Sequence, residues 1–174
     1  MLKKPPQGFT AIEMLITISI LGILAAIAAP SFKNLLINAQ IRTAAQGLTD
    51  GIQLARAEAI RLNQPTVFTK GTQSSWTITV VNGGATLQSR PHTEGSTVAT
   101  VAVTPNAATK ITFNSLGRVI ANADASAAIR QLDIDAPTSS ISAADSKELR
   151  IIVTGGGAVR LCDPNGTAGV GMGC

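Results

Sequence analysis

The chain of 174 residues is poor in ring side chains: it has no tyrosine, one tryptophan, four phenylalanines and a single histidine, His92. This composition excludes a large aromatic core, and the many small and β-branched residues favour short strands with glycine-rich turns. A lone histidine cannot supply a histidine cluster, and His92 shows no obvious acidic or nucleophilic partner. We therefore expect a surface-loop histidine and neither a metal site, a cofactor nor enzymatic activity.

Acidic side chains are also few, and only one pair of them suggests a cation site. Asp133 and Asp135 alternate along a predicted strand and so share one face of it. A cation site would need further oxygen ligands, and no third candidate stands near them in the sequence. We expect a solvated strand face.

The chain lacks a strong charge of either sign beyond its first residues. The formal charge is +4, but Lys3 and Lys4 precede an apolar run. Residues 63–174 hold eight basic and seven acidic side chains. A nearly neutral domain has no strong field to hold a phosphate backbone, so the composition gives no indication of nucleic-acid binding.

The most distinctive segment is an apolar run from Phe9 to Ala29 that contains one charged residue, Glu13. As a helix, its 21 residues would span about 30 Å, the thickness of a membrane hydrocarbon core. Lys3 and Lys4 on the N-terminal side favour a cytoplasmic N-terminus, with the bulk of the chain outside. A carboxylate within such a run is unfavourable without a partner and is a functional-site hypothesis by default.

A secretory signal peptide is an alternative interpretation of the same residues. Lys3 and Lys4 would form its basic region, and Ala26-Ile27-Ala28 resembles a small-residue cleavage site. The apolar regions of signal peptides usually run about 7 to 15 residues, which is shorter than this run. A soluble exported domain that starts near Ala29 or Pro30 stays an alternative, although neither it nor a plain anchor explains Glu13.

The segment Gly8-Phe9-Thr10-Ala11-Ile12-Glu13, followed by the apolar run, resembles the class III signal of type IV pilins and type II secretion pseudopilins. That family more often has leucine at the position of Ala11. The resemblance implies that a prepilin peptidase cleaves between Gly8 and Phe9 and N-methylates Phe9. It also implies a role for Glu13 in assembly, through the amine of a neighbouring subunit or, alternatively, the amine of its own chain. Such pairing has a physical basis, because an unpaired carboxylate in an apolar medium is unfavourable.

Residues 30–63 have the spacing of an amphipathic helix. Gly47 and Gly51 weaken it by up to about 1 kcal/mol each relative to alanine, and Asn63 and Pro65 end the pattern. Apolar residues at steps of three or four predict one buried face, made of Ile37, Ile41, Ala44, Leu48, Ile52, Ala55, Ala59 and Leu62.

From Thr66 onward the hydrophobic period changes to two, which predicts short strands. The glycine-rich residues 82–85 and 154–158 lie between strands and predict hairpin turns. The runs with this pattern cover residues 66–70, 76–81, 97–103, 109–114, 117–121, 130–135, 148–153 and 158–162.

Both cysteines, Cys162 and Cys174, lie in the last 13 residues. Their spacing fits no zinc or CxxC pattern, and a chain behind a membrane-targeting segment reaches an oxidising compartment. We therefore expect a disulfide between them. In the chain-entropy model, closing a loop of this size stabilises the fold by roughly 3 kcal/mol.

Residues 53–65, 112–119 and 148–164 resemble the GspH/FimT group of minor pilins and minor pseudopilins. Similar pieces in that group are a hairpin with Phe and Gly-Arg, and a late strand that ends in Arg-Leu/Ile-Cys-Asp-Pro, with a second cysteine near the terminus. Members have a type IV pilin-like fold, in which a long N-terminal helix packs against two small antiparallel sheets. The expected fold class is therefore α+β.

The resemblance implies a minor type IV pilin of the FimT/FimU kind that primes or caps pilus assembly. One alternative is a GspH-like minor pseudopilin of type II secretion. Another is a pilus-tip receptor for DNA uptake, with Arg118 and Arg160 as candidate contacts. The loop from Cys162 to Cys174 contains no Lys or Arg, and two arginines without aromatic stacking partners make a weak site. We rank DNA binding below assembly.

The expected organisation has four parts: a cleaved leader (1–8), a transmembrane helix (9–29), an amphipathic stalk helix (30–63) and a β domain (64–174). The resemblance implies a single-pass protein of the inner membrane, with a cytoplasmic N-terminus before cleavage and a periplasmic C-terminal domain. The resemblance further implies that the processed chain is incorporated into a pilus or pseudopilus. The expected partners are the prepilin peptidase, other minor pilins or pseudopilins, the major pilin and inner-membrane lipid.

Overall fold

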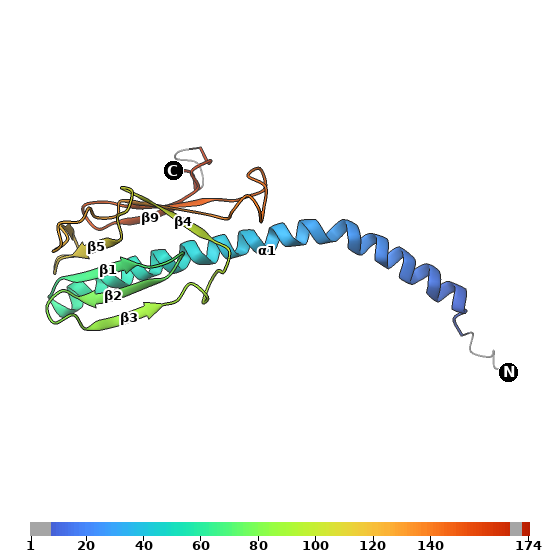
Figure 1. The fold of residues 1–174 in the computed structure, drawn as a ribbon, viewed down its shortest axis with the longest axis horizontal. Coiled ribbons are helices and arrows are strands. Elements are labelled where there is room, and N and C mark those ends of the chain that lie inside the picture. Colours follow the sequence, from blue (N-terminus) through green and yellow to red (C-terminus); the bar gives the residue numbers. More distant parts are fainter. Residues whose placement is uncertain (1–7, 168–171) are drawn as a thin grey trace, which may run out of the picture. The chain divides into compact units, whose positions relative to one another are not determined.

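The computed structural model describes residues 8–167 and 172–174. One helix, α1 (Ala11–Leu62), precedes all of the strands in that part of the chain (Figure 1). The chain divides within α1 into two compact units, the first ending at Leu35 and the second beginning at Leu36. Each unit is described by itself below.

The described residues of the N-terminal unit include no buried apolar side chain. From Phe9 to Ile27 its large apolar side chains are exposed: Phe9, Ile12, Met14, Leu15, Ile16, Ile18, Ile20, Leu21, Ile23, Leu24 and Ile27. Among the described residues, no single helix has the length and hydropathy of a membrane span, but Ala11–Ile27 and Ser31–Leu62 meet that test together as a bent pair. The transmembrane helix over 9–29 stays a prediction.

In the C-terminal unit, α1 buries the face that the sequence pattern predicts. Seven of the eight predicted residues, from Ile37 to Ala59, are buried, and only Leu62 is half-buried. On the other side of the helix Thr43, Gln46 and Asp50 are exposed. This confirms the amphipathic assignment, because one stripe of the helix faces a core and the opposite stripe does not.

A five-stranded antiparallel sheet lies beside this part of α1, and Figure 1 shows β1, β2 and β3 running along the helix. Phe68, Trp76 and Ile78 alternate with half-buried neighbours and point into the core. The strands, in their order across the sheet, are β3 (Thr86–Arg90), β2 (Trp76–Val80), β1 (Thr66–Lys70), β5 (Lys110–Phe113) and β6 (Val119–Ile120).

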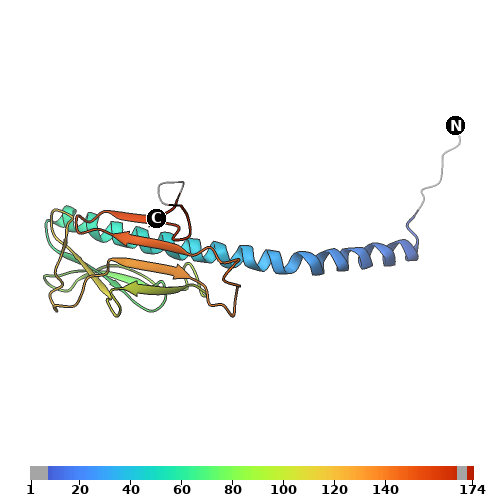
Figure 2. The same cartoon turned by 90° about the horizontal axis from the view of Figure 1, so that it is seen from above.

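A four-stranded antiparallel sheet completes the core (Figure 2). Its inward residues, such as Leu132, Ile134 and Ile151, join the helix and the first sheet in one cluster of buried side chains. The strands, in their order across the sheet, are β4 (Thr100–Thr104), β7 (Gln131–Asp135), β8 (Leu149–Val153) and β9 (Val159–Cys162). The predicted hairpin turns at 82–85 and 154–158 are confirmed, because they connect paired neighbours.

Two hairpins, one from each sheet, meet beside the helix. The backbone N–H of Val119 donates to the carbonyl oxygen of Gly155 at 3.1 Å, and Nε of Arg56 on α1 donates to the carbonyl oxygen of Gly117 at 3.0 Å. A Cβ on Gly157 would lie 1.9 Å from that same oxygen, and the φ of Gly157 is +82°. Only glycine fits there, so Gly157 permits the contact between the sheets.

The C-terminal tail is attached to the end of β9. Cys162 and Cys174 form a disulfide. The N–H of Asp163 donates to the carbonyl oxygen of Met172 at 2.7 Å, and the N–H of Cys174 donates to that of Asp163 at 3.1 Å. Nη2 of Arg160 donates to the carbonyl oxygen of Gly173 at 2.7 Å. Covalent and hydrogen bonds together hold the chain end against the sheet.

The two glycines within the helical pattern have packing roles. A Cβ on Gly51 would lie 2.6 Å from Cε2 of Trp76, whose indole is buried, and a Cβ on Gly47 would lie 2.0 Å from Nη1 of Arg90. The indole cannot move without disturbing the core, whereas the Arg90 guanidinium is the far end of a flexible side chain.

We predict that Gly51→Ala destabilises the protein by about 1–2 kcal/mol. Overpacking against Trp76 costs about 1–3 kcal/mol, which exceeds the helix-propensity gain of up to about 1 kcal/mol. Gly47→Ala is the matched control and should change stability by less than about 1 kcal/mol, because Arg90 can turn away. Unfolding of the full chain in detergent, followed by the fluorescence of Trp76, measures both; equal effects of the two variants would contradict the packing argument.

Candidate functional site

Thr10 and Glu13 form a reciprocal cap at the start of α1. The Glu13 N–H donates to Oγ1 of Thr10 at 3.3 Å. In return, Oε2 of Glu13 accepts from the Thr10 N–H and from the Thr10 hydroxyl, each at 3.0 Å. This capping box satisfies backbone donors that the first helical turn otherwise leaves unpaired. This cap was not among the features expected from the sequence, although Thr-x-x-Glu before an apolar run is its signature.

The cap leaves part of the Glu13 carboxylate available. Both bonds from Thr10 go to Oε2, and among the described residues no hydrogen bond reaches Oε1. An ionised carboxylate accepts about four hydrogen bonds over its two oxygens. Phe9, whose N–H would become an amine on cleavage after Gly8, is 87 % exposed. The arrangement can therefore bind a cation from a second molecule without giving up the cap.

The candidate DNA contacts lie on different elements. Arg118 is exposed in the turn between β5 and β6, and Arg160 lies on β9. The hydrogen bond from Arg160 to the carbonyl of Gly173 holds its guanidinium against the chain's own tail. The tail therefore competes with any phosphate for this side chain.

The remaining polar candidates serve the fold. Asp133 forms an ion pair with Nε of Arg150 at 2.5 Å, and Asp135 accepts a hydrogen bond from the Ser146 hydroxyl. His92 lies in the loop between β3 and β4. Within residues 8–167 and 172–174, no three acidic, histidine or cysteine side chains gather as metal ligands would.

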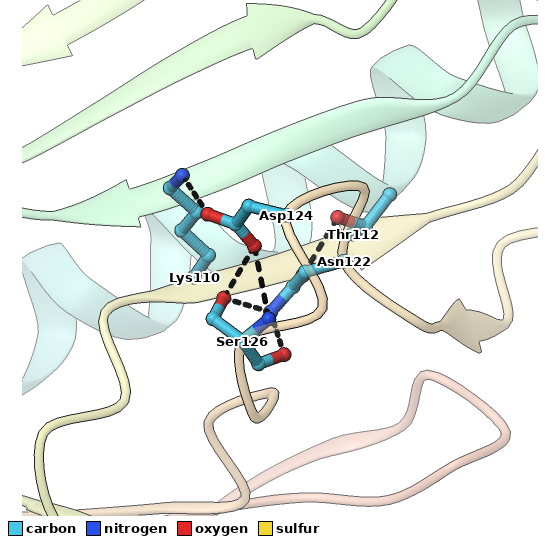
Figure 3. A network of polar contacts seen from close by, with 5 residues as sticks. All are labelled: Lys110, Thr112, Asn122, Asp124 and Ser126. Carbon is cyan, nitrogen blue, oxygen red and sulfur yellow. Dashed lines mark hydrogen bonds and ion pairs between the residues drawn. The ribbon is translucent and has the colours of Figure 1, made fainter.

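A cluster of five polar residues, shown in Figure 3, fastens the loop after β6 to strand β5. Asp124 pairs with Nζ of Lys110 at 2.5 Å and accepts from the Ser126 hydroxyl at 2.6 Å. The Thr112 hydroxyl donates to Oδ1 of the buried Asn122 at 2.8 Å, and Nδ2 of Asn122 donates to the Ser126 carbonyl at 3.0 Å. These groups satisfy one another, which indicates a structural clamp.

Comparisons with known proteins match both parts of the chain. The family described as "Type II transport protein GspH" matches residues 44–157, about two thirds of the chain. The chain belongs to the GspH family. The "Prokaryotic N-terminal methylation motif" matches residues 3–29, which include the capping box. No curated protein matches the chain.

Two solved structures are similar to this GspH-family chain, and both are crystal forms of the type IV minor pilin FimU from Pseudomonas aeruginosa PAO1. One is 15 % identical with a TM-score of 0.48, and covers 69 % of this chain and 90 % of FimU. The other is 16 % identical with a TM-score of 0.49, and covers 70 % and 87 %.

The GspH domain and the methylation motif together make the chain a subunit of the class that comprises minor type IV pilins and pseudopilins. Members of this class are structural subunits, made as prepilins and assembled with other pilins. A methylation motif followed by a long helix fits a pilin anchored in the inner membrane.

We predict that the clamp of Figure 3 makes stability pH-dependent in acid. The hydrogen bond from Lys110, followed by those from Ser126, holds the pKa of Asp124 far below its usual range. Because the folded-state pKa is lowered, the stabilisation is present above the unfolded pKa of about 3.9 and is lost as the pH falls through the folded value. Asp124→Asn should therefore lower the melting temperature at pH 6, and the gap from wild type should close towards pH 2.

Thermal unfolding of the full chain at a series of pH values measures this gap. In a Lys110→Met background the same Asp124→Asn change should produce a smaller pH-dependent gap, because the largest contribution to the shifted pKa is gone. A gap that stays constant from pH 6 to pH 2 would show that the ion pair contributes nothing to stability.

Proposed function

We propose that the chain is a minor type IV pilin, similar to FimT and FimU, that primes or caps the assembly of a pilus. The observation that carries the proposal is the presence of a GspH domain and an N-terminal methylation motif in one chain. Such a subunit acts by association: α1 packs among other helices, and the β domain contacts its neighbours.

A minor pseudopilin of type II secretion is the second candidate. The description of the matching family as a type II transport protein favours it. The N-terminal signal and the long helix fit a type IV pilus and a type II secretion system equally well. The DNA-receptor alternative has less support, because the guanidinium of Arg160 is held by the chain's own Gly173.

In the proposed mechanism, the prepilin peptidase hydrolyses the Gly8–Phe9 peptide bond, which leaves an α-amine on Phe9 that is then N-methylated. Glu13 of one subunit meets the Phe9 amine of the next. Because Thr10 occupies only Oε2, Oε1 is available to this amine while the capping box stays closed. The prior cap orients the carboxylate, which reduces the entropy lost on pairing.

We predict that Glu13→Gln permits cleavage and blocks docking. The amide oxygen of glutamine can still accept from Thr10, so the cap is retained, but the negative charge that pairs with an amine is lost. Breaking an ion pair in an apolar medium leaves an uncompensated charge and costs about 3–5 kcal/mol, so we expect at least a tenfold loss of the subunit from purified filaments.

Immunoblots of membranes and filaments, with a size shift for leader removal, measure both steps. Glu13→Ala removes cap and charge together and should be no better at docking than Glu13→Gln. Wild-type amounts of processed Glu13→Gln in filaments would refute the role given to the charge.

Deletion of the gene tests the proposed function itself. The deletion strain is scored in parallel for surface pili and for release of a type II secretion substrate, and it is complemented with the wild-type gene as a control. Lost pili with intact secretion support the minor pilin. Lost secretion with normal pili would overturn it in favour of the pseudopilin.

A further inference from the structure

Within the part of the chain that the structure describes, strand β3 has a partner strand on one side only. It pairs with β2 and stands at the end of the five-stranded order, and Figure 1 shows it as the outermost strand of that sheet. The unpaired N–H and C=O groups of an edge strand can pair with another extended chain. The sequence Thr-Leu-Gln-Ser-Arg of β3 has one charge, at its end, and no proline to prevent such pairing.

A groove lies beside this edge, between α1 and β3. It consists of two adjoining hollows, of about 400 and 110 Å3, that share Leu54 of the helix and Gln88 of the strand. The larger hollow is also lined by Asp50, Trp76 and Glu94. Both the free strand edge and the groove lie in the C-terminal unit, so the two features together form one surface.

The larger hollow carries net negative charge, because two carboxylates, Asp50 and Glu94, and one cation, Arg90, line it. The carboxylates of Asp50 and Glu94 have no hydrogen-bond or ion-pair partner among residues 8–167 and 172–174. The guanidinium of Arg90 donates through Nε, at 3.0 Å, and Nη2 to the backbone carbonyl of Glu94, so it keeps its charge and forms no ion pair with either carboxylate. The indole Nε1 of Trp76 is buried and also lacks a partner within the described residues.

We propose that this groove binds an extended polypeptide segment that carries a lysine or arginine and adds to β3 as a further strand. The strand edge supplies backbone hydrogen bonds, as in other cases of β-strand addition. Because side chains alternate along a strand, every second one faces the groove, where Asp50 and Glu94 attract a basic group. A nucleic acid is disfavoured, because the two carboxylates would repel its phosphates.

The probe is a blocked heptapeptide, Thr-Ser-Thr-Lys-Thr-Ser-Thr, and the same peptide with a central glutamate. Each is titrated into the full chain in detergent micelles, and backbone amide signals are followed by NMR. We expect the lysine peptide to bind with a dissociation constant in the millimolar range or lower, at least about fivefold tighter than the glutamate peptide. Amide exchange should slow in β3 and stay unchanged in β4, which is at one edge of the other sheet.

A charge swap makes the test specific. Asp50 and Glu94 are both exposed, so Asp50→Lys with Glu94→Lys should leave the fold intact, which thermal unfolding checks. The double variant should reverse the preference and bind the glutamate peptide more tightly. Glu148→Lys, on another surface, is the matched control and should leave the preference for lysine unchanged.

The proposal would be overturned by the absence of binding at millimolar peptide, by equal affinity for both peptides, or by protection of β4 in place of β3. An unreversed preference in the charge-swapped variant would also overturn it. The proposal does not depend on whether the chain serves a pilus or a secretion machine, so the deletion experiment and this one can fail separately.

Discussion

The close approach of α1 to both sheets is the constraint on which the C-terminal unit depends. The buried face of the helix consists largely of small residues, so its backbone can lie near the strands, and the sheets supply the bulk through Phe68, Trp76 and Phe113. A helix with large side chains on this face would hold the sheets apart and leave voids, which protein interiors do not tolerate. The small residues in question are Ala44, Ala45, Gly47, Gly51, Ala55 and Ala59.

The contact between the two hairpins also depends on a residue without a side chain. Arg56 reaches from the helix to the carbonyl of Gly117, and the absence of a side chain at Gly157 lets the second hairpin approach that carbonyl. Three elements thus meet at one peptide group. The two sheets have no strand in common. This junction and the shared core therefore hold the two sheets in their relative position.

Much of this architecture could be predicted, because it follows from local periodicity. The buried stripe of α1 and both glycine-rich hairpins follow from spacing alone, and the structure also contains the expected disulfide. Strand β3 did not follow, since Thr-Leu-Gln-Ser-Arg has little apolar alternation and its strand conformation depends on pairing with β2. The packing roles of Gly47 and Gly51 depend on Arg90 and Trp76, which are distant in sequence. Helix propensity alone predicts only that these two glycines destabilise the helix.

The candidate site, too, could be predicted from the sequence only in part. The spacing of Gly8, Phe9 and Glu13 can be read from the sequence. That Thr10 bonds only one of the two carboxylate oxygens of Glu13 is known only from the structure. The groove beside β3 could not be foreseen either, because its two carboxylates, Asp50 and Glu94, come from a helix and a loop that are 44 positions apart.

The bonds between residues 172–174 and the end of β9 have a consequence for reducing conditions. Cys174 is bonded to Cys162 through sulfur and to Asp163 through its backbone, and Arg160 donates to the carbonyl of Gly173. Reduction would break only the covalent bond. The attachment of this segment to the sheet would then become an equilibrium that these hydrogen bonds govern.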